Sequence, residues 1–415
     1  MTPSVRKGIF AVIGLHLFLW IALGSPWPGT DDLCYLNQAE RIADGSYQFD
    51  ESPKNQRLGM ILPTYVAISV FGKTPMAIAI YPLLASILSI VLLARFLNTQ
   101  PMTALLAGVL LACNVTQLTF ATVLFPDVIL ALIMFAITYM VWERTNESVF
   151  NAIAASLLLV IGFFIKQLIV LVVPYLGFIL IRDFIKGQHL RFAKIFIGTS
   201  LTLSAIILIG IFYYTGDWLF LLNTIEENHN AVFATLEGES LWKRLTYEPI
   251  AFLSGLAGYW PLLLLSAAGF ISRAQVSEER KLRGLLLYLL LVFWFVSTSV
   301  KTYAPVLLLD RMWIPLLIPL CGLAAIAIEK MNDYDWKKKT FVFILFVISA
   351  MNCLMQGNEG EAFFYLLIPV SILVRNVLER GRYKVVPQEY TRLFQAIPFL
   401  LIAIWFVWSN SLHQG

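Results

Sequence analysis

Long apolar runs, each ended by a short polar stretch, dominate the 415-residue sequence. A helix that crosses the hydrocarbon core of a bilayer needs about 20 mostly apolar residues, and fewer where its ends are polar. Thirteen runs meet this requirement, so the sequence predicts an all-α polytopic membrane protein with about 13 transmembrane helices. The runs lie near residues 8–23, 76–97, 101–120, 125–142, 149–165, 168–181, 195–214, 251–271, 285–300, 312–328, 340–356, 362–378 and 394–410.

Two polar segments between the runs are much longer than the others. Residues 24–75 and residues 215–249 are each long enough to hold short interfacial helices. The apolar run at residues 58–71 is too short to cross a bilayer, and we expect it to lie at the membrane interface. We predict two modules, residues 1–214 with spans 1–7 and the first outer loop, and residues 215–415 with spans 8–13.

The loops on the two sides of the membrane, as the predicted spans define them, carry different charge. With the N-terminus inside, the inner segments carry 21 Lys and Arg residues against 10 acids, and the outer segments carry 9 against 16. Cytoplasmic loops of membrane proteins are enriched in Lys and Arg, so the N-terminus is predicted to be cytoplasmic and the C-terminus outside. The composition, 59% hydrophobic and 13% charged, excludes a soluble protein, which carries roughly 25% charged residues. The net charge of +4 is then a topology signal and does not indicate nucleic acid as a partner.

The few cysteines and histidines do not form a metal-binding pattern. The chain has four of each, and the spacings typical of zinc sites, such as CxxC or HExxH, are absent from the sequence. We therefore predict no metal site. Three of the cysteines, Cys113, Cys321 and Cys353, fall in apolar runs and are interpreted as small buried hydrophobic residues.

Several charged residues stand directly beside the outer ends of apolar runs. A charge at the membrane edge costs free energy, and such residues are candidates for function. The alternative for each is an interfacial anchor or a solvated loop charge. An acidic pair follows the first span in WPGTDDLCYLNQ, and a proline–aspartate step opens the fourth span in LFPDVILAL. The candidates are Asp31, Asp32, Arg57, Asp127, Lys166, Lys301, Asp310 and Arg311, with Tyr303 close to Lys301 in SVKTYAP.

Two of these residues allow contrasting interpretations. Asp127 follows Pro126 and could stabilise the positive N-terminal end of a helix, or it could be a second carboxylate that faces the first pair. Lys166 interrupts the apolar sequence IGFFIKQLIVLVV. It could reach water at the turn between spans five and six, or it could bind phosphate, for which an ammonium is suited as a point charge.

In their order along the chain, these residues resemble the GT-C membrane glycosyltransferases, in particular those of the protein-mannosyltransferase and aminoarabinose-transferase type. The similarity is carried by four patterns, and it covers roughly the first 200 residues well and the rest loosely. The patterns are the acidic pair with Tyr35 and Ala39, the segment RLGMILPTYVAISVFG, the Pro126–Asp127 step, and the lysine of IGFFIKQ followed by Lys301 and Arg311 ahead of Pro315 and Pro319. The sequence departs from the family in its Asp–Asp pair, where Asp–Glu is usual, and in Arg57–Leu58–Gly59, which replaces a lysine–diproline.

The resemblance implies an inverting transferase that takes a sugar from a polyprenyl phosphate on the periplasmic side of a bacterial inner membrane. The acceptor would be a glycan, a lipid or a protein. The catalytic residues would be Asp31, Asp32 and Asp127, with Asp31 as the base. Substrate binding would fall to Tyr35, Arg57, Lys166, Lys301, Tyr303 and Arg311. No cofactor or divalent metal is expected.

Two other functions remain open from the sequence. A flippase or transporter for lipid-linked saccharides would also be polytopic, although carriers usually place polar groups near the middle of the bilayer. Here the runs are apolar through their middles and the charges collect at one end. A polymerase for lipid-linked saccharides would also act on the outer side.

Overall fold

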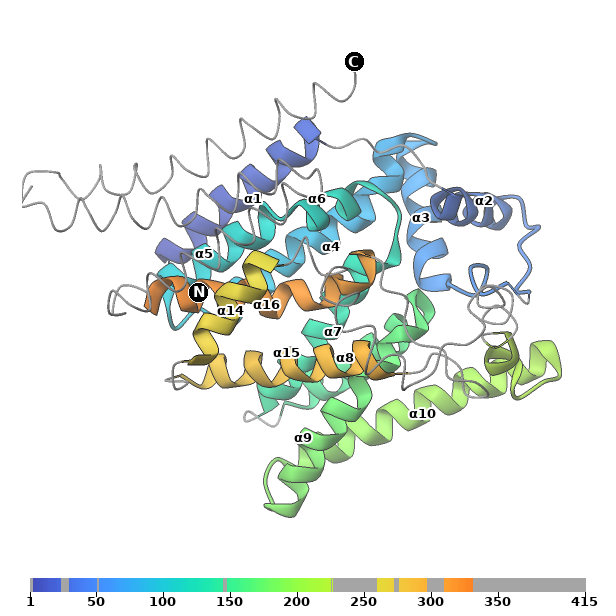
Figure 1. The fold of residues 1–415 in the computed structure, drawn as a ribbon. Coiled ribbons are helices and arrows are strands. Elements are labelled where there is room, and N and C mark those ends of the chain that lie inside the picture. The colour runs from blue at the N-terminus through green and yellow to red at the C-terminus, as the bar shows by residue number, and fades with distance from the viewer. Residues whose placement is uncertain are drawn as a thin grey trace, which may run out of the picture.

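The computed structural model describes residues 3–23, 30–50, 52–144, 148–224, 226, 260–271, 276–296 and 310–330. Within these ranges every regular element is a helix (Figure 1). In chain order they are α1 (Pro3–Leu23), α2 (Thr30–Ala43), α3 (Leu58–Phe71), α4 (Pro75–Phe96), α5 (Pro101–Ala112), α6 (Val115–Thr122), α7 (Pro126–Trp142), α8 (Val149–Ile165), η2 (Gln167–Val172), α9 (Val173–Ile185), α10 (Leu190–Thr215), α14 (Trp260–Ile271), α15 (Ser277–Phe295), η5 (Asp310–Trp313) and α16 (Ile314–Lys330).

The described helices follow the apolar runs of the sequence. Five of them are long and apolar enough to cross a membrane, or six if the bent pair α5–α6 is one span, and α7 and α8 are shorter apolar helices. The predicted all-α membrane fold is therefore confirmed. The spans predicted at 340–356, 362–378 and 394–410 lie outside the described residues, so the total of 13, the placement of the termini and the division into two modules stay predictions.

Helix α3 has the bounds expected for the interfacial run. It begins directly after Arg57 and ends before Gly72, whose φ of +71° lies in the left-handed region that favours glycine. It packs beside α2, and the two lie together at one end of the helical bundle (Figure 1). This pair carries the first outer loop's candidate residues to a single end of the molecule.

The run expected as one span at residues 101–120 is divided into α5 and α6, which meet at an angle of 58°. Asn114 begins the second helix, because its side chain accepts a hydrogen bond from the backbone N–H of Gln117 at 3.0 Å. The carbonyl of Ala112, freed by the break, accepts a hydrogen bond from Nδ1 of buried His16 at 2.8 Å. Ser86 lies 2.9 Å from the other ring nitrogen. The break is thus stabilised by polar groups from α1 and α4.

Helix α16 forms the centre of the bundle. Over its span, 83% of the residues are buried, and it packs against α5, α7, α14 and α15 (Figure 1). Helix α10 is the opposite case, since only 11% of its span is buried and it contacts mainly α8. An apolar helix that is so exposed presents most of its surface to lipid.

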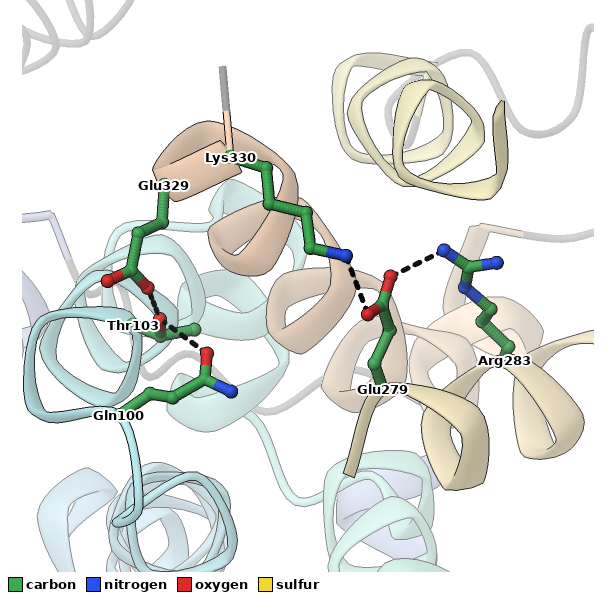
Figure 2. Close-up of polar contacts among 6 residues, drawn as sticks. All are labelled: Gln100, Thr103, Glu279, Arg283, Glu329 and Lys330. Carbon is green, nitrogen blue, oxygen red and sulfur yellow. Dashed lines mark hydrogen bonds and ion pairs between the residues drawn. The ribbon is translucent and has the colours of Figure 1, made fainter. Parts of the chain in front are cut away.

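Ion pairs join α15 to α16, and a hydrogen bond joins α16 to α5, at one end of the bundle (Figure 2). The carboxylate of Glu279, which is fully buried, pairs with Arg283 and, at 2.7 Å, with Lys330. Nearby, the hydroxyl of Thr103 donates to the carboxylate of Glu329. A buried carboxylate with two cationic partners fixes how the start of α15 meets the end of α16.

The opposite end gathers a different set of residues, because α8 runs antiparallel to α7 and ends beside the first turn of α7. Helices α7 and α16 begin there, and α8 ends there. The first residues of α7, the residue after α8 and the residues before α16 are therefore neighbours.

Candidate active site

A buried ion pair joins the end of α8 to the start of α7. Lys166 lies between α8 and η2 in an extended backbone conformation, and its Nζ is 2.5 Å from Oδ1 of Asp127. Asp127 occupies the first turn of α7, directly after Pro126. Both side chains are buried, with 9% and 2% of their surfaces exposed. The interpretation that Lys166 simply reaches water is therefore wrong for this structure, because its ammonium points into the protein.

The second cation of the site is Arg57, which precedes α3. Its Nη1 donates to the hydroxyl of Tyr35, a fully buried residue of α2. Arg57 comes close to Lys166 because α3 meets α8 at Gly59. A Cβ atom there would lie 2.6 Å from a side-chain carbon of Ile165 and 3.0 Å from its backbone nitrogen. Glycine is needed at position 59 for this close approach.

The third cation, Arg311, comes from η5 at the start of α16. Its guanidinium lies 4.8 Å from the centre of the Phe125 ring, a distance typical of a cation–π contact. The next residue, Met312, accepts a hydrogen bond from Nζ of Lys166 at 3.2 Å, so η5 and the α8–η2 junction are in direct contact.

The three cations are near enough to act on one another. Burial lowers the pKa of Lys166, the charge of Asp127 opposes this shift, and the charges of Arg57 and Arg311 add to it. Three cations therefore lie close to the carboxylate of Asp127. Such a group of cations is suited to an anion, and arginine and lysine bind phosphate and carboxylate groups through charge-assisted hydrogen bonds.

The carboxylate of Asp127 has an oxygen that is not used by the ion pair. Its Oδ2 is buried, and no group among the described residues donates a hydrogen bond to it. The Nε of Arg57 is likewise buried without an acceptor in the described part of the chain. Buried polar atoms are nearly always hydrogen-bonded in native proteins, so the two atoms mark positions suited to a polar ligand.

The remaining candidates are placed as follows. Asp32 lies on α2 three residues before Tyr35, on the same side of the helix, and it is 1% exposed. Asp31 is also on α2, but its side chain lies outside the description. Lys301 and Tyr303 fall outside the described residues.

Sequence reasoning missed three residues that shape the site. Met312 and Phe125 each contact a predicted cation, and Gly59 allows α3 to approach α8. Phe125 could have been identified from the sequence, because it directly precedes the Pro126–Asp127 step. The contact of Met312 had no signal in the sequence, because it joins segments 146 residues apart.

The described helices form an all-helical membrane fold, as predicted. Solved structures with this fold include ArnT from Cupriavidus metallidurans in the apo state, with a TM-score of 0.59 and 14% sequence identity. That match covers 97% of this chain and 76% of the ArnT chain. The crystal structure of the same protein bound to undecaprenyl phosphate matches with a TM-score of 0.64 and 13% identity over 96% of this chain and 76% of ArnT. No family model and no curated protein matches the sequence. At these identities the similarity shows a shared fold, and the predicted resemblance is confirmed at that level.

Proposed function

We propose that this protein is a glycosyltransferase that moves a sugar from a polyprenyl-phosphate donor to an acceptor on the outer side of a bacterial inner membrane. The observation that carries this proposal is the buried Lys166–Asp127 pair with the partly buried Arg57 and Arg311 near it, at one end of a bundle with the ArnT fold. The bound undecaprenyl phosphate of ArnT supports a donor of that class. The excess of Lys and Arg in the inner loops supports an outward-facing site.

The reaction places growing negative charge on phosphate. In a single displacement, the acceptor oxygen or nitrogen attacks the anomeric carbon and loses its proton to Asp31, the general base. The bond between the anomeric carbon and the phosphate oxygen breaks, and its electron pair stays on the departing polyprenyl phosphate. Attack from the side opposite the leaving group inverts the anomeric centre. The leaving phosphate thereby gains one negative charge, which the cation group stabilises.

The ion pair prepares Lys166 for this role. An ammonium has three N–H donors, and two of them already have partners, Asp127 and the weakly accepting sulfur of Met312. The third donor has no partner among the described residues and is suited to a phosphate oxygen, and a phosphate would readily displace the sulfur. Asp127 fixes the ammonium, and its second oxygen can accept a hydrogen bond from a sugar hydroxyl.

The other candidates complete the proposed substrate site. Asp32 positions the acceptor or the sugar beside Asp31, and Tyr35 orients the guanidinium of Arg57 through its hydroxyl. Lys301 and Tyr303 belong to the proposed substrate-binding set on the strength of the sequence resemblance. A divalent metal is not part of this proposal, because basic side chains hold the phosphate.

The test is transfer by the purified protein in lipid vesicles. Radiolabelled polyprenyl-phosphate monosaccharide is supplied with a total envelope extract as the acceptor source. Label that moves to a new acceptor indicates a transferase. Label that only changes leaflet indicates a carrier, and growth of a polymer on the lipid indicates a polymerase.

The role of Asp31 is tested by Asp31→Asn. We expect this variant to lose transfer while it still folds and binds the donor, and Asp44→Asn, an exposed acid just past α2, is the matched control. Turnover of Asp31→Asn near the parent rate would show that the base is a different residue.

A further inference from the structure

A cavity of about 570 Å³, wide open to the surface, lies between the first outer loop and the end of α10. This volume is within the usual range of small-molecule sites, about 300–1,000 Å³. The cavity is separate from the cation group, and its lining comes from two segments far apart in sequence. The lining residues are Phe49, Asp50, Ser52, Tyr214, Thr215 and Phe220.

One wall of the cavity is a set of aromatic rings. Phe49 stands between Tyr214 and Phe220, with ring centres 6.2 Å and 5.9 Å away. The chain can present Tyr214 and Phe220 to the same cavity because α10 ends at Gly216, whose φ of +74° turns the backbone sharply. Asp217 stabilises the turn by accepting a hydrogen bond from the backbone N–H of Leu219 at 2.8 Å.

The other wall is a polar turn built around Asp50. One carboxylate oxygen accepts from the backbone N–H of Ser52 at 2.8 Å, and the other accepts from the side-chain amide of Asn55 at 2.7 Å. Tyr47 donates its hydroxyl to the carbonyl of Asn55 at 2.6 Å. Burial and the nearby charge of Asp50 raise the pKa of Tyr47 to about 12, so this hydroxyl stays protonated at neutral pH. The turn is therefore held in one shape before any ligand binds.

The same turn connects the cavity to the proposed active site. The side-chain amide of Gln56 donates to the carbonyl of Asp50 at 3.1 Å, and the next residue is Arg57. Asn55 and Gln56 are both buried, so the turn packs firmly into the protein. A molecule bound in the cavity would lie beside the loop that carries a cation of the active site.

Charge and shape together select the class of ligand. Asp50 is the single charged residue among the six described residues that line the cavity, so phosphate groups are disfavoured beside it. Within the described part of the chain, each oxygen of its carboxylate accepts one hydrogen bond, and it can accept another from a hydroxyl or an ammonium. The apolar C–H face of a sugar ring packs on an aromatic ring, while its hydroxyls reach the polar wall.

We propose that this cavity binds the saccharide portion of the acceptor, in the form of a neutral sugar or an amino sugar. The proposal rests on the proposed transferase function, and it adds a second subsite that holds the acceptor beside the donor's phosphate. Aromatic residues also gather at membrane interfaces, where they anchor a protein to lipid. The carboxylate at the centre of the polar wall favours a hydroxylated ligand over a lipid tail.

Direct binding of saccharides tests the cavity without reference to the donor. The full chain in lipid nanodiscs is titrated by ligand-detected NMR with cellobiose, maltose, glucosamine and N,N′-diacetylchitobiose. We expect at least one of these probes to bind and its affinity to fall about tenfold in Phe49→Leu, Phe220→Leu and Asp50→Asn, the size of one lost contact. The matched control is Phe150→Leu, an exposed ring at the start of α8, which should bind as the parent does. Absence of binding by all four probes, or equal binding in the three cavity variants, would overturn the proposal.

Kinetic measurements distinguish a failure of the acceptor-site inference from a failure of the proposed transferase function on which it rests. In the transfer assay, Phe49→Leu and Phe220→Leu should raise the KM for the acceptor, while the slow hydrolysis of the donor by water continues at the parent rate. Loss of donor hydrolysis together with transfer would overturn the acceptor assignment. If the parent protein neither hydrolyses nor transfers the donor sugar, the proposed transferase function fails, and the NMR titration still decides whether the cavity binds saccharides.

Discussion

Removing Asp127 from its ion pair gives the sharpest test of how the site is built. In Asp127→Asn the ammonium of Lys166 stays buried, because 9% of that side chain is exposed, and it loses its one carboxylate partner in the described residues. Breaking a buried pair by removal of one partner costs about 3–5 kcal/mol. A cost of this size is a large fraction of the stability of an ordinary domain, about 5–15 kcal/mol.

The matched set of variants isolates the pair. Lys166→Met alone leaves Asp127 as a buried, unpaired acid, whereas the double variant Asp127→Asn/Lys166→Met leaves no charge at either position. Replacing both partners of a buried pair by uncharged groups is often neutral or stabilising. We therefore expect the double variant to unfold closer to the parent's midpoint than either single variant does. All three should lose sugar transfer.

The pH dependence of Asp127→Asn follows from the same contact. Without the carboxylate, burial and the two arginines act unopposed, so the folded-state pKa of Lys166 falls further below its unfolded value. The unfolded chain then binds more protons than the folded chain, and stability rises with pH up to the unfolded pKa. The loss of stability in Asp127→Asn, measured against the parent at the same pH, should therefore become smaller as the pH rises.

The assay is thermal unfolding in a single detergent, followed by intrinsic tryptophan fluorescence at several pH values. The reasoning would be refuted by an Asp127→Asn protein that unfolds with the parent. It would equally be refuted by a double variant whose loss equals the sum of the two single losses, since that result means the two residues are not coupled.

Three further predictions concern the surroundings of the site. Gly59→Ala places a Cβ 2.6 Å from a side-chain carbon of Ile165, and overpacking of this kind costs about 1–3 kcal/mol. We expect α3 to move away from α8 and the KM for the donor to rise. An unchanged KM would show that the close approach of the two helices is not needed. At the opposite end, Glu279→Gln leaves Arg283 and Lys330 without their carboxylate, so the midpoint of thermal unfolding should fall while kcat stays at the parent value. The control is Arg280→Gln, at an exposed position of the same helix. A loss of kcat without a loss of stability would contradict a structural role. Transfer should continue in excess EDTA, and activity that EDTA removes and Mg²⁺ restores would mean that a metal takes part.

The sequence was most informative where local signals act alone. Helix α3 has the expected bounds because Arg57 precedes a short apolar run and Gly72 ends it. The break between α5 and α6 was not foreseen, since the apolar run continues through it. Asn114 is a local signal for a helix start. The bend itself is stabilised by His16, which hydrogen-bonds the carbonyl of Ala112, 96 residues away in the chain.

The site shows the same limit. The apolar pattern placed Asp127 and Lys166 at one membrane face, and the antiparallel order of α7 and α8 brings those ends together. That the two side chains form a pair depends on how the helices rotate against each other, which periodicity does not determine. The approach of Arg57 depends on the absent side chain of Gly59, and this is visible only once α3 and α8 are packed.

Helix α16 joins the two ends of the bundle with a fixed span. It is held at Lys330 by a buried carboxylate, and 20 residues separate that anchor from the cation at its other end, counting Arg311 and Lys330 themselves. Each residue of an α-helix advances the chain by 1.5 Å and rotates it by about 100°. Inserting or deleting a single residue anywhere between the two would therefore move the guanidinium of Arg311 away from Phe125 and from the proposed phosphate position, even if the change were made in the middle of the helix. In chimeras that exchange outer loops between proteins with this fold, the number of residues from Arg311 to Lys330 should therefore be kept.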